Sequence, residues 1–197
     1  MKQLLIVLVV AFSAWNLFSG PGSVSLGPGV MAENPPVQED PIEPDPFDFD
    51  QYTITPLASF DIKAKVLSKK SYVMGRPAEL SPVDLTLGWQ NMSDESVLAD
   101  IRISQSNRWY HWRVDDFPIP RREIETQSAN MHLIPANEEI ESLIDQARQG
   151  DIIELSGNLV RVDADDGWHW VSSLSRNDTG NHACELIWVE QFRVITL

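Results

Sequence analysis

The sequence predicts a small β-rich α+β domain that follows an N-terminal membrane helix and a disordered tether. Stretches in which polar and apolar residues alternate dominate residues 57–197, and one clear amphipathic helix interrupts them. Alternation with a period of two is typical of half-buried strands, whereas apolar residues three and four apart indicate a helix. The domain is therefore expected to be one strongly curved sheet or small barrel with one main helix.

The first 18 residues have the layout of a membrane-targeting segment. Lys2 precedes an apolar stretch that extends from Leu4 to Phe18, as the charged and hydrophobic regions of a signal sequence do. Pairs of small residues that would permit cleavage are poor, so an uncleaved signal anchor is favoured over a cleaved signal peptide or a buried helix. A single-pass anchor in a bacterial inner membrane would place the domain in the periplasm, with Lys2 inside.

Residues 19–56 are predicted to be a disordered tether. They are rich in glycine, serine and proline, and their second half is acidic without a basic residue. Such a composition disfavours a packed core and favours a solvated spacer; an acidic recognition segment is the alternative. The net charge of −14 also argues against nucleic acid as a partner, because phosphate binding needs clustered Lys and Arg.

The domain itself is expected to occupy residues 57–197. The main helix is predicted within residues 136–150, with Asn137 as its N-cap and Gly150 at its C-terminal end. A shorter helix is expected in residues 93–101, capped by Ser93 or Asp94. Strand patterns cover residues 60–73, 106–117, 150–162, 168–173 and 184–195.

Two glycine-containing features of the sequence support a curved architecture. Asp166-Gly167 can form a two-residue hairpin turn, and Gly157 in the middle of a strand fits a bulge or a corner. A helix that leads into such a strand is reminiscent of an OB-like barrel. This analogy concerns the fold and does not fix the function.

The candidate catalytic residues are His132, Cys184, Asp178 and Arg176. A thiol nucleophile needs a base such as imidazole and a group that stabilises negative charge. His132 could be the base, Asp178 the group that orients it and Arg176 an anion clamp. The competing interpretation is structural: Cys184, the only cysteine, opens an apolar alternation with Leu186 and Trp188, so its thiol would face the core.

A zinc site formed by His132, His182 and Cys184 is a third hypothesis. The spacing of His182 and Cys184 is weak support for it, so no metal and no cofactor are predicted. Tryptophan is frequent, with seven residues, and a tryptophan-lined groove could bind sugars or peptides, although core packing explains these residues as well.

Four segments resemble a family of small bacterial proteins with an N-terminal membrane segment and no established function. They are ELSPVDLTLGW, SANMHLIPANEEI, GDIIELSGNLV and SSLSRNDTGNHACELIWVE. The resemblance implies a bacterial envelope setting and no catalytic residue. The expected function is a membrane-anchored, non-catalytic binding domain for an envelope protein or a cell-wall ligand; a hydrolase or transferase that uses Cys184 and His132 is the alternative.

Overall fold

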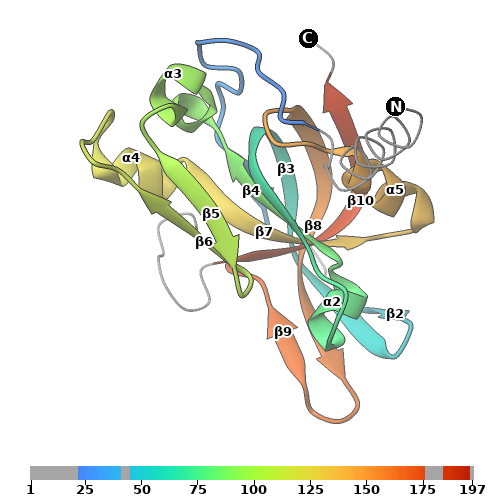
Figure 1. The fold of residues 1–197 in the computed structure, drawn as a ribbon. Helices are drawn as coiled ribbons and strands as arrows, with labels where there is room; N and C mark the ends of the chain where they lie inside the picture. Colours follow the sequence, from blue (N-terminus) through green and yellow to red (C-terminus); the bar gives the residue numbers. More distant parts are fainter. Residues whose placement is uncertain (1–21, 41–44, 176–183, 196–197) are drawn as a thin grey trace, which may run out of the picture.

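A computed structural model describes residues 22–40, 45–175 and 184–195. The chain forms an eight-stranded sheet and a separate two-stranded sheet, with few and short helices (Figure 1), which confirms the predicted β-rich class. The larger sheet contains β1 (Val37–Glu39), β2 (Phe47–Phe49), β3 (Tyr52–Ser71), β4 (Val83–Gly88), β7 (Ser128–Pro135), β8 (Ile152–Ala164), β9 (His169–Val171) and β10 (Glu185–Ile195). The smaller sheet consists of β5 (Arg102–Ser106) and β6 (Trp109–Arg113).

Five strands of the larger sheet are paired in a closed ring. The 20-residue strand β3 pairs with β4 along one part and with β8 along another. The path β3-β4-β7-β10-β8 thereby returns to β3. β7 and β10 run parallel, and the other four pairings are antiparallel.

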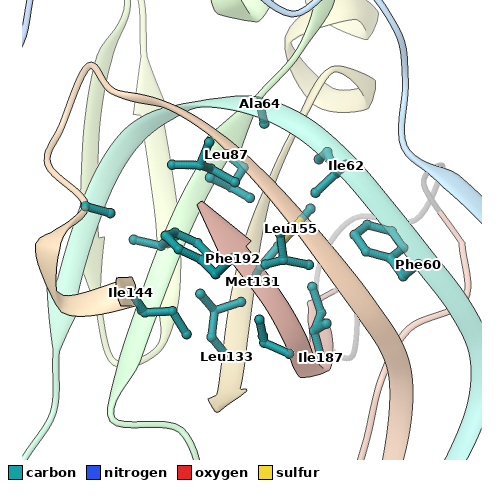
Figure 2. Close-up of a cluster of buried hydrophobic side chains, with 14 of the residues drawn as sticks. Phe60, Ile62, Ala64, Leu87, Met131, Leu133, Ile144, Leu155, Ile187 and Phe192 are labelled. Atoms are coloured by element: carbon teal, nitrogen blue, oxygen red, sulfur yellow. The ribbon is translucent and has the colours of Figure 1, made fainter. Parts of the chain in front are cut away.

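The interior of the ring holds the main hydrophobic core. Side chains from all five strands point into it, including Phe60, Leu87, Leu133, Leu155 and Ile187 (Figure 2). These apolar residues occupy every second position of their strands, and the alternation in the sequence predicted β3, β8 and β10, but not β4 and β7. The helix α5 (Glu138–Gln146) adds Ile140 and Ile144 to the same cluster.

The strong curvature of the strands has local causes. A Cβ atom at Gly157 would lie 1.9 Å from the carbonyl oxygen of Trp188, so only glycine permits this close approach of β8 and β10. The β8–β10 register shifts next to this point, between Val189 and Gln191. Gly157 therefore has the role that its position in the sequence predicted, at an irregularity that bends the sheet.

The short connections differ from the predicted ones in detail. The side chain of Asn137 accepts a hydrogen bond from the backbone of Ile140, so α5 begins as expected, but the helix ends at Gln146 because Ala147 is already extended. The connection between β8 and β9 spans residues 165–168 and is longer than the predicted two-residue turn; within it, only Gly167 has a positive φ. The remaining helices are α2 (Arg76–Leu80), the 3-10 helix η1 (Gln90–Ser93), α3 (Glu95–Leu98) and α4 (Arg121–Thr126).

The β5–β6 hairpin forms a sheet of its own. Ile103 and Trp112 at its base pack against a small apolar cluster around Leu67 and Ile124. Its two-residue turn, Asn107-Arg108, has positive φ at both positions, which is the geometry that suits a tight hairpin. Arginine is uncommon in this left-handed conformation, so contacts elsewhere must hold the turn.

The N-terminal segment expected to be a disordered tether makes specific contacts wherever the structure describes it. The backbone N–H groups of Leu26 and Gly27 donate to the Glu95 carboxylate, and those of Met31 and Ala32 donate to Ser93 Oγ. We call residues 22–32 the N-terminal strap. Polar and glycine-rich composition does not prevent such docking, because acceptor side chains of the domain satisfy the backbone of the strap.

The predicted boundary of the folded domain also differs. β1 and β2 both pair with β3, and β3 begins at Tyr52 rather than at residue 57. The predicted membrane helix, residues 1–18, lies outside the described residues. Within the part of the chain that is described, no helix has the length and apolar character needed to cross a membrane.

Candidate functional site

A pocket of about 580 Å³ lies between the tip of the β5–β6 hairpin and the β8–β9 hairpin. Its size falls within the range of small-molecule binding sites. The elements that surround it are far apart in sequence: helix α2, the β5–β6 turn, β7, the β8–β9 hairpin and the segment that leads into β10. Its lining residues are Pro77, Arg108, Trp109, His132, Trp168, His169, Trp170, Val171 and Cys184.

His132 lines the base of this pocket, and Asp84 is its fully buried neighbour behind the pocket surface. They are direct cross-strand partners on β7 and β4, and both side chains are almost completely buried. Nδ1 of His132 lies 2.9 Å from Oδ1 of Asp84, but the ring N–H does not point along this line, so the contact is an ion-pair distance without hydrogen-bond geometry. His132 lies in the middle of β7, although the sequence predicted no strand there.

Arg108, in the β5–β6 turn, contacts the same Asp84 carboxylate. Its Nη1 lies 2.8 Å from Oδ1 of Asp84, and its Nη2 donates to the carbonyl oxygen of Ser81 at 3.0 Å. Its guanidinium also stacks on the ring of Tyr72, 4.0 Å from the centroid. One buried carboxylate thus holds two groups that line the pocket, one from a central strand and one from the hairpin tip.

Aromatic rings make up much of the wall. Trp168, just before β9, and Trp170, within β9, lie edge to face with centroids 6.4 Å apart. Trp170 also lies against the His132 ring, at 4.8 Å. An arginine stacks on each indole: Arg76 on Trp168 at 5.3 Å and Arg108 on Trp170 at 5.4 Å.

Both of these arginines are neutralised by the protein itself. Arg108 pairs with Asp84, and Arg76 forms two hydrogen bonds with Asp166. The hydrogen bond from Arg76 lowers the pKa of Asp166 to about 2. An anionic ligand therefore finds no uncompensated arginine among these residues, and the wall favours a neutral ligand with an apolar face.

Tyr72 joins the loop before β4 to the hairpin tip. Its hydroxyl accepts a hydrogen bond from the backbone N–H of Arg108 at 3.1 Å. Burial raises the pKa of Tyr72, and the nearby Asp84 carboxylate raises it further, against the opposing effect of Arg108. The phenol therefore stays protonated at neutral pH and keeps its place over the guanidinium.

Cys184 lines the same pocket as His132. It precedes β10, is half-buried, and its Sγ lies 4.0 Å from the carbonyl oxygen of Arg108. Leu186 and Trp188, which alternation grouped with it, are buried in a different apolar cluster around Ile54 and Val162. The thiol is thus less enclosed than the structural interpretation expected, because the chain before Glu185 is not yet part of a strand.

The remaining predicted site residues are not reached by the structure. Arg176, Asp178 and His182 all lie outside the described residues, so their roles stay predictions. Among the residues that are described, no group of three or more His, Cys, Asp or Glu side chains is arranged to hold a metal ion. The zinc hypothesis depends on His182 and is therefore neither supported nor contradicted.

Sequence reasoning missed Asp84 and Arg108. Asp84 stands within the apolar strand VDLTLG, and a carboxylate in a buried strand is a signal for a pairing partner. Arg108 belongs to the stretch SNRWYHWR, where Asn107 marks a turn. Their contact could not be foreseen, because a long-range pairing joins a hairpin tip to a distant strand.

Comparisons with known proteins do not identify the site. The chain matches no protein-family model, no curated protein and no solved structure. The chemistry of the pocket combines a tryptophan wall, which suits an apolar face, with a polar base of Arg108 and His132 held by the buried Asp84.

Proposed function

We propose that the closed ring is an OB-like barrel that binds a small neutral ligand, with a saccharide unit of the cell wall as the best candidate. The ring strands follow the order first, second, third, fifth and fourth along the chain. α5 lies between the third and fourth of them and packs Ile140 and Ile144 into the core of the ring. OB-type barrels bind oligosaccharides and oligonucleotides through the loops between the first two and the last two strands.

The observation that carries the proposal is the composition of the pocket wall. The loop that joins the first two ring strands contributes Pro77, and the connection between the last two contributes Trp168 and Trp170. Indole faces pack against the C–H faces of a sugar ring, and the polar base can hydrogen-bond to its hydroxyl groups. Oligonucleotides are disfavoured by the net charge of −14.

The proposed setting is the bacterial envelope, with the domain anchored to the inner membrane by residues 1–18. Lys2 and the apolar run after it support this setting. A reporter that is active only outside the cytosol, fused after residue 197, should be active and sediment with the membrane fraction. A soluble, inactive fusion would exclude the anchor.

Binding is tested by titrating the protein with N-acetylglucosamine and its β-1,4-linked oligomers while following tryptophan fluorescence. Trp170→Ala should weaken binding at least tenfold, because it removes the ring that contacts both His132 and Arg108. Trp112→Ala is the matched control, since Trp112 packs against Phe117 at the hairpin base. Equal effects of the two substitutions, or no binding by any of these sugars, would refute the proposal.

A Cys/His-dependent hydrolase or transferase is the second candidate function. The observation that favours it is that Cys184 and His132 line one pocket, with Asp84 behind the imidazole. In a catalytic triad of this kind, Cys184 would be the nucleophile, His132 the base and Asp84 the group that orients the base. The sequence did not predict Asp84 in this role. The unusual feature is Arg108, which shares the carboxylate and competes with the imidazole for it.

A further inference from the structure

The outer face of β4 and β7 carries a layer of buried polar side chains. Asp84 is the cross-strand partner of His132, and Thr86 that of Asn130. All four are at most 4% exposed. Their neighbours along the strands, such as Leu85 and Met131, point the other way into the core. Polar pairs at successive positions on this face are costly unless their hydrogen bonds are satisfied.

The tip of the β5–β6 hairpin covers this layer. Gln105 Nε2 donates to Asn130 Oδ1 at 2.7 Å, and Asn130 Nδ2 donates to the carbonyl oxygen of Arg108 at 3.1 Å. Thr86 Oγ1 shares the same acceptor on Asn130 at 3.3 Å. The hairpin is thus fixed at its tip by polar contacts, whereas its base is fixed by the apolar packing of Ile103 and Trp112.

The covered layer is incompletely satisfied. Within the described residues, Asp84 Oδ2, Gln105 Oε1 and His132 Nδ1 are buried and have no hydrogen-bond partner. Native proteins leave few such atoms, and each one calls for an explanation. The two oxygens can only accept hydrogen bonds, so the chemistry that suits the layer is a ligand rich in donors.

The turn that holds the cover in place is backbone-strained. Arg108 has φ +63°, and its contacts with Asp84, Ser81 and Tyr72 hold it there. Strain of this kind persists only where surrounding contacts enforce it, and it is concentrated at functional and switching segments. A hairpin with an apolar base and a strained polar tip can pivot about its base.

We propose that the β5–β6 hairpin is a lid over a second part of the ligand site, and that the layer beneath it binds further sugar units of a glycan chain. This inference rests on the proposed function, because the first unit occupies the tryptophan-lined pocket. His132 belongs to both the pocket and the layer, so the two are continuous. Sugar hydroxyls supply donors without a charge, whereas a phosphate would be repelled by Asp84.

The test compares the affinities of N-acetylglucosamine and its β-1,4-linked tetramer by calorimetry in three variants. Gln105→Ala loosens the lid without altering the pocket, so the tetramer should bind about fivefold more tightly while monomer affinity is unchanged. Thr86→Val removes a hydroxyl from the layer, so the tetramer should bind about fivefold more weakly, again without effect on the monomer. Ser104→Ala, on the exposed side of β5, should change neither.

The outcomes separate the two proposals. If the monomer binds but the tetramer gains nothing over it, or if neither Gln105→Ala nor Thr86→Val alters the ratio of the two affinities, the lid is refuted and the pocket stands. If neither sugar binds, the proposed function fails and the lid inference fails with it. Melting temperatures show whether each variant is folded. If Thr86→Val does not fold, the effect of Gln105→Ala on the ratio of the two affinities decides the test.

Discussion

Nη1 of Arg108 lies 2.8 Å from Oδ1 of Asp84, which joins the tip of the β5–β6 hairpin to the buried centre of β4. The carboxylate is fully buried and the guanidinium is 17% exposed. The same oxygen lies 2.9 Å from His132. The contacts of Asp84 with Arg108 and His132 therefore fix the β5–β6 hairpin, β4 and the imidazole relative to one another, and the shape of the pocket depends on them.

Arg108→Ala is expected to destabilise the domain by about 3 kcal/mol, because it leaves the Asp84 carboxylate buried without its main counterion. The double variant Arg108→Met with Asp84→Leu should recover much of this loss. Arg102→Ala is the control on the same hairpin: its ion pair with Asp115 is exposed and should contribute less than about 1 kcal/mol. Urea denaturation measures all three, and equal losses for Arg108→Ala and Arg102→Ala would contradict the buried pair.

The N-terminal strap depends on a close approach at Gly150. A Cβ atom there would lie 1.8 Å from the carbonyl oxygen of Val24, and Gly150 has φ +94°. Gly150→Ala should therefore displace the strap and lower the melting temperature by several degrees. Gly167→Ala is a matched control with φ +86° and open space around the Cβ position, so it reports backbone strain alone. Similar losses for both variants would mean that the strap contributes nothing.

Acid should release the strap through Glu95. Burial raises the pKa of this carboxyl, but hydrogen bonds from Ser25, Leu26 and Lys65 outweigh burial and hold the pKa at about 2, against 4.5. A depressed folded-state pKa means that the stabilisation is complete above pH 4.5 and is lost as the pH falls towards 2. Protease sensitivity of residues 22–32 should rise in this window in the parent protein, whereas Glu95→Gln should be sensitive at neutral pH already. A parent strap that stays protected at pH 2.5 would show that other contacts hold it.

Thiol reactivity separates the binding module from the enzyme. We expect Cys184 to be alkylated in the native protein, because it is half-buried and lines the pocket, but no faster than an ordinary thiol at neutral pH. His132→Ala should leave this rate within about twofold. If the native thiol reacts faster than free cysteine and His132→Ala abolishes the difference, then Cys184, His132 and Asp84 form a catalytic set.

The fold was predictable where one residue pattern determines one local structure. The alternation from Ile153 to Leu159 predicted strand β8, the stripe of Ile140 and Ile144 predicted helix α5, and Gly157 predicted the bend. The docking of residues 22–32 was not predictable, because it depends on acceptor side chains such as Glu95 that lie about 70 positions away in the sequence. Composition alone could indicate only that this segment lacks a core of its own.

The site was predictable in part, and for a similar reason. His132 and Cys184 were identified by residue type, and the structure brings both to one pocket. Asp84 and Arg108 were missed because their importance comes from a long-range pairing. The tryptophans as a group were recognised as suited to a binding groove, but sequence alone could not separate the three that line the pocket from Trp89, which is buried in the core.

The indole N–H signals of the tryptophans offer the most direct measurement of whether this pocket binds a saccharide. In a two-dimensional NMR titration with N-acetylglucosamine, the signals of Trp109, Trp168 and Trp170 should shift together with one dissociation constant. The signals of Trp89 and Trp112, which do not line the pocket, should stay in place. If no signal moves at millimolar sugar, or if Trp89 and Trp112 move while the pocket tryptophans do not, this pocket is not a saccharide-binding site.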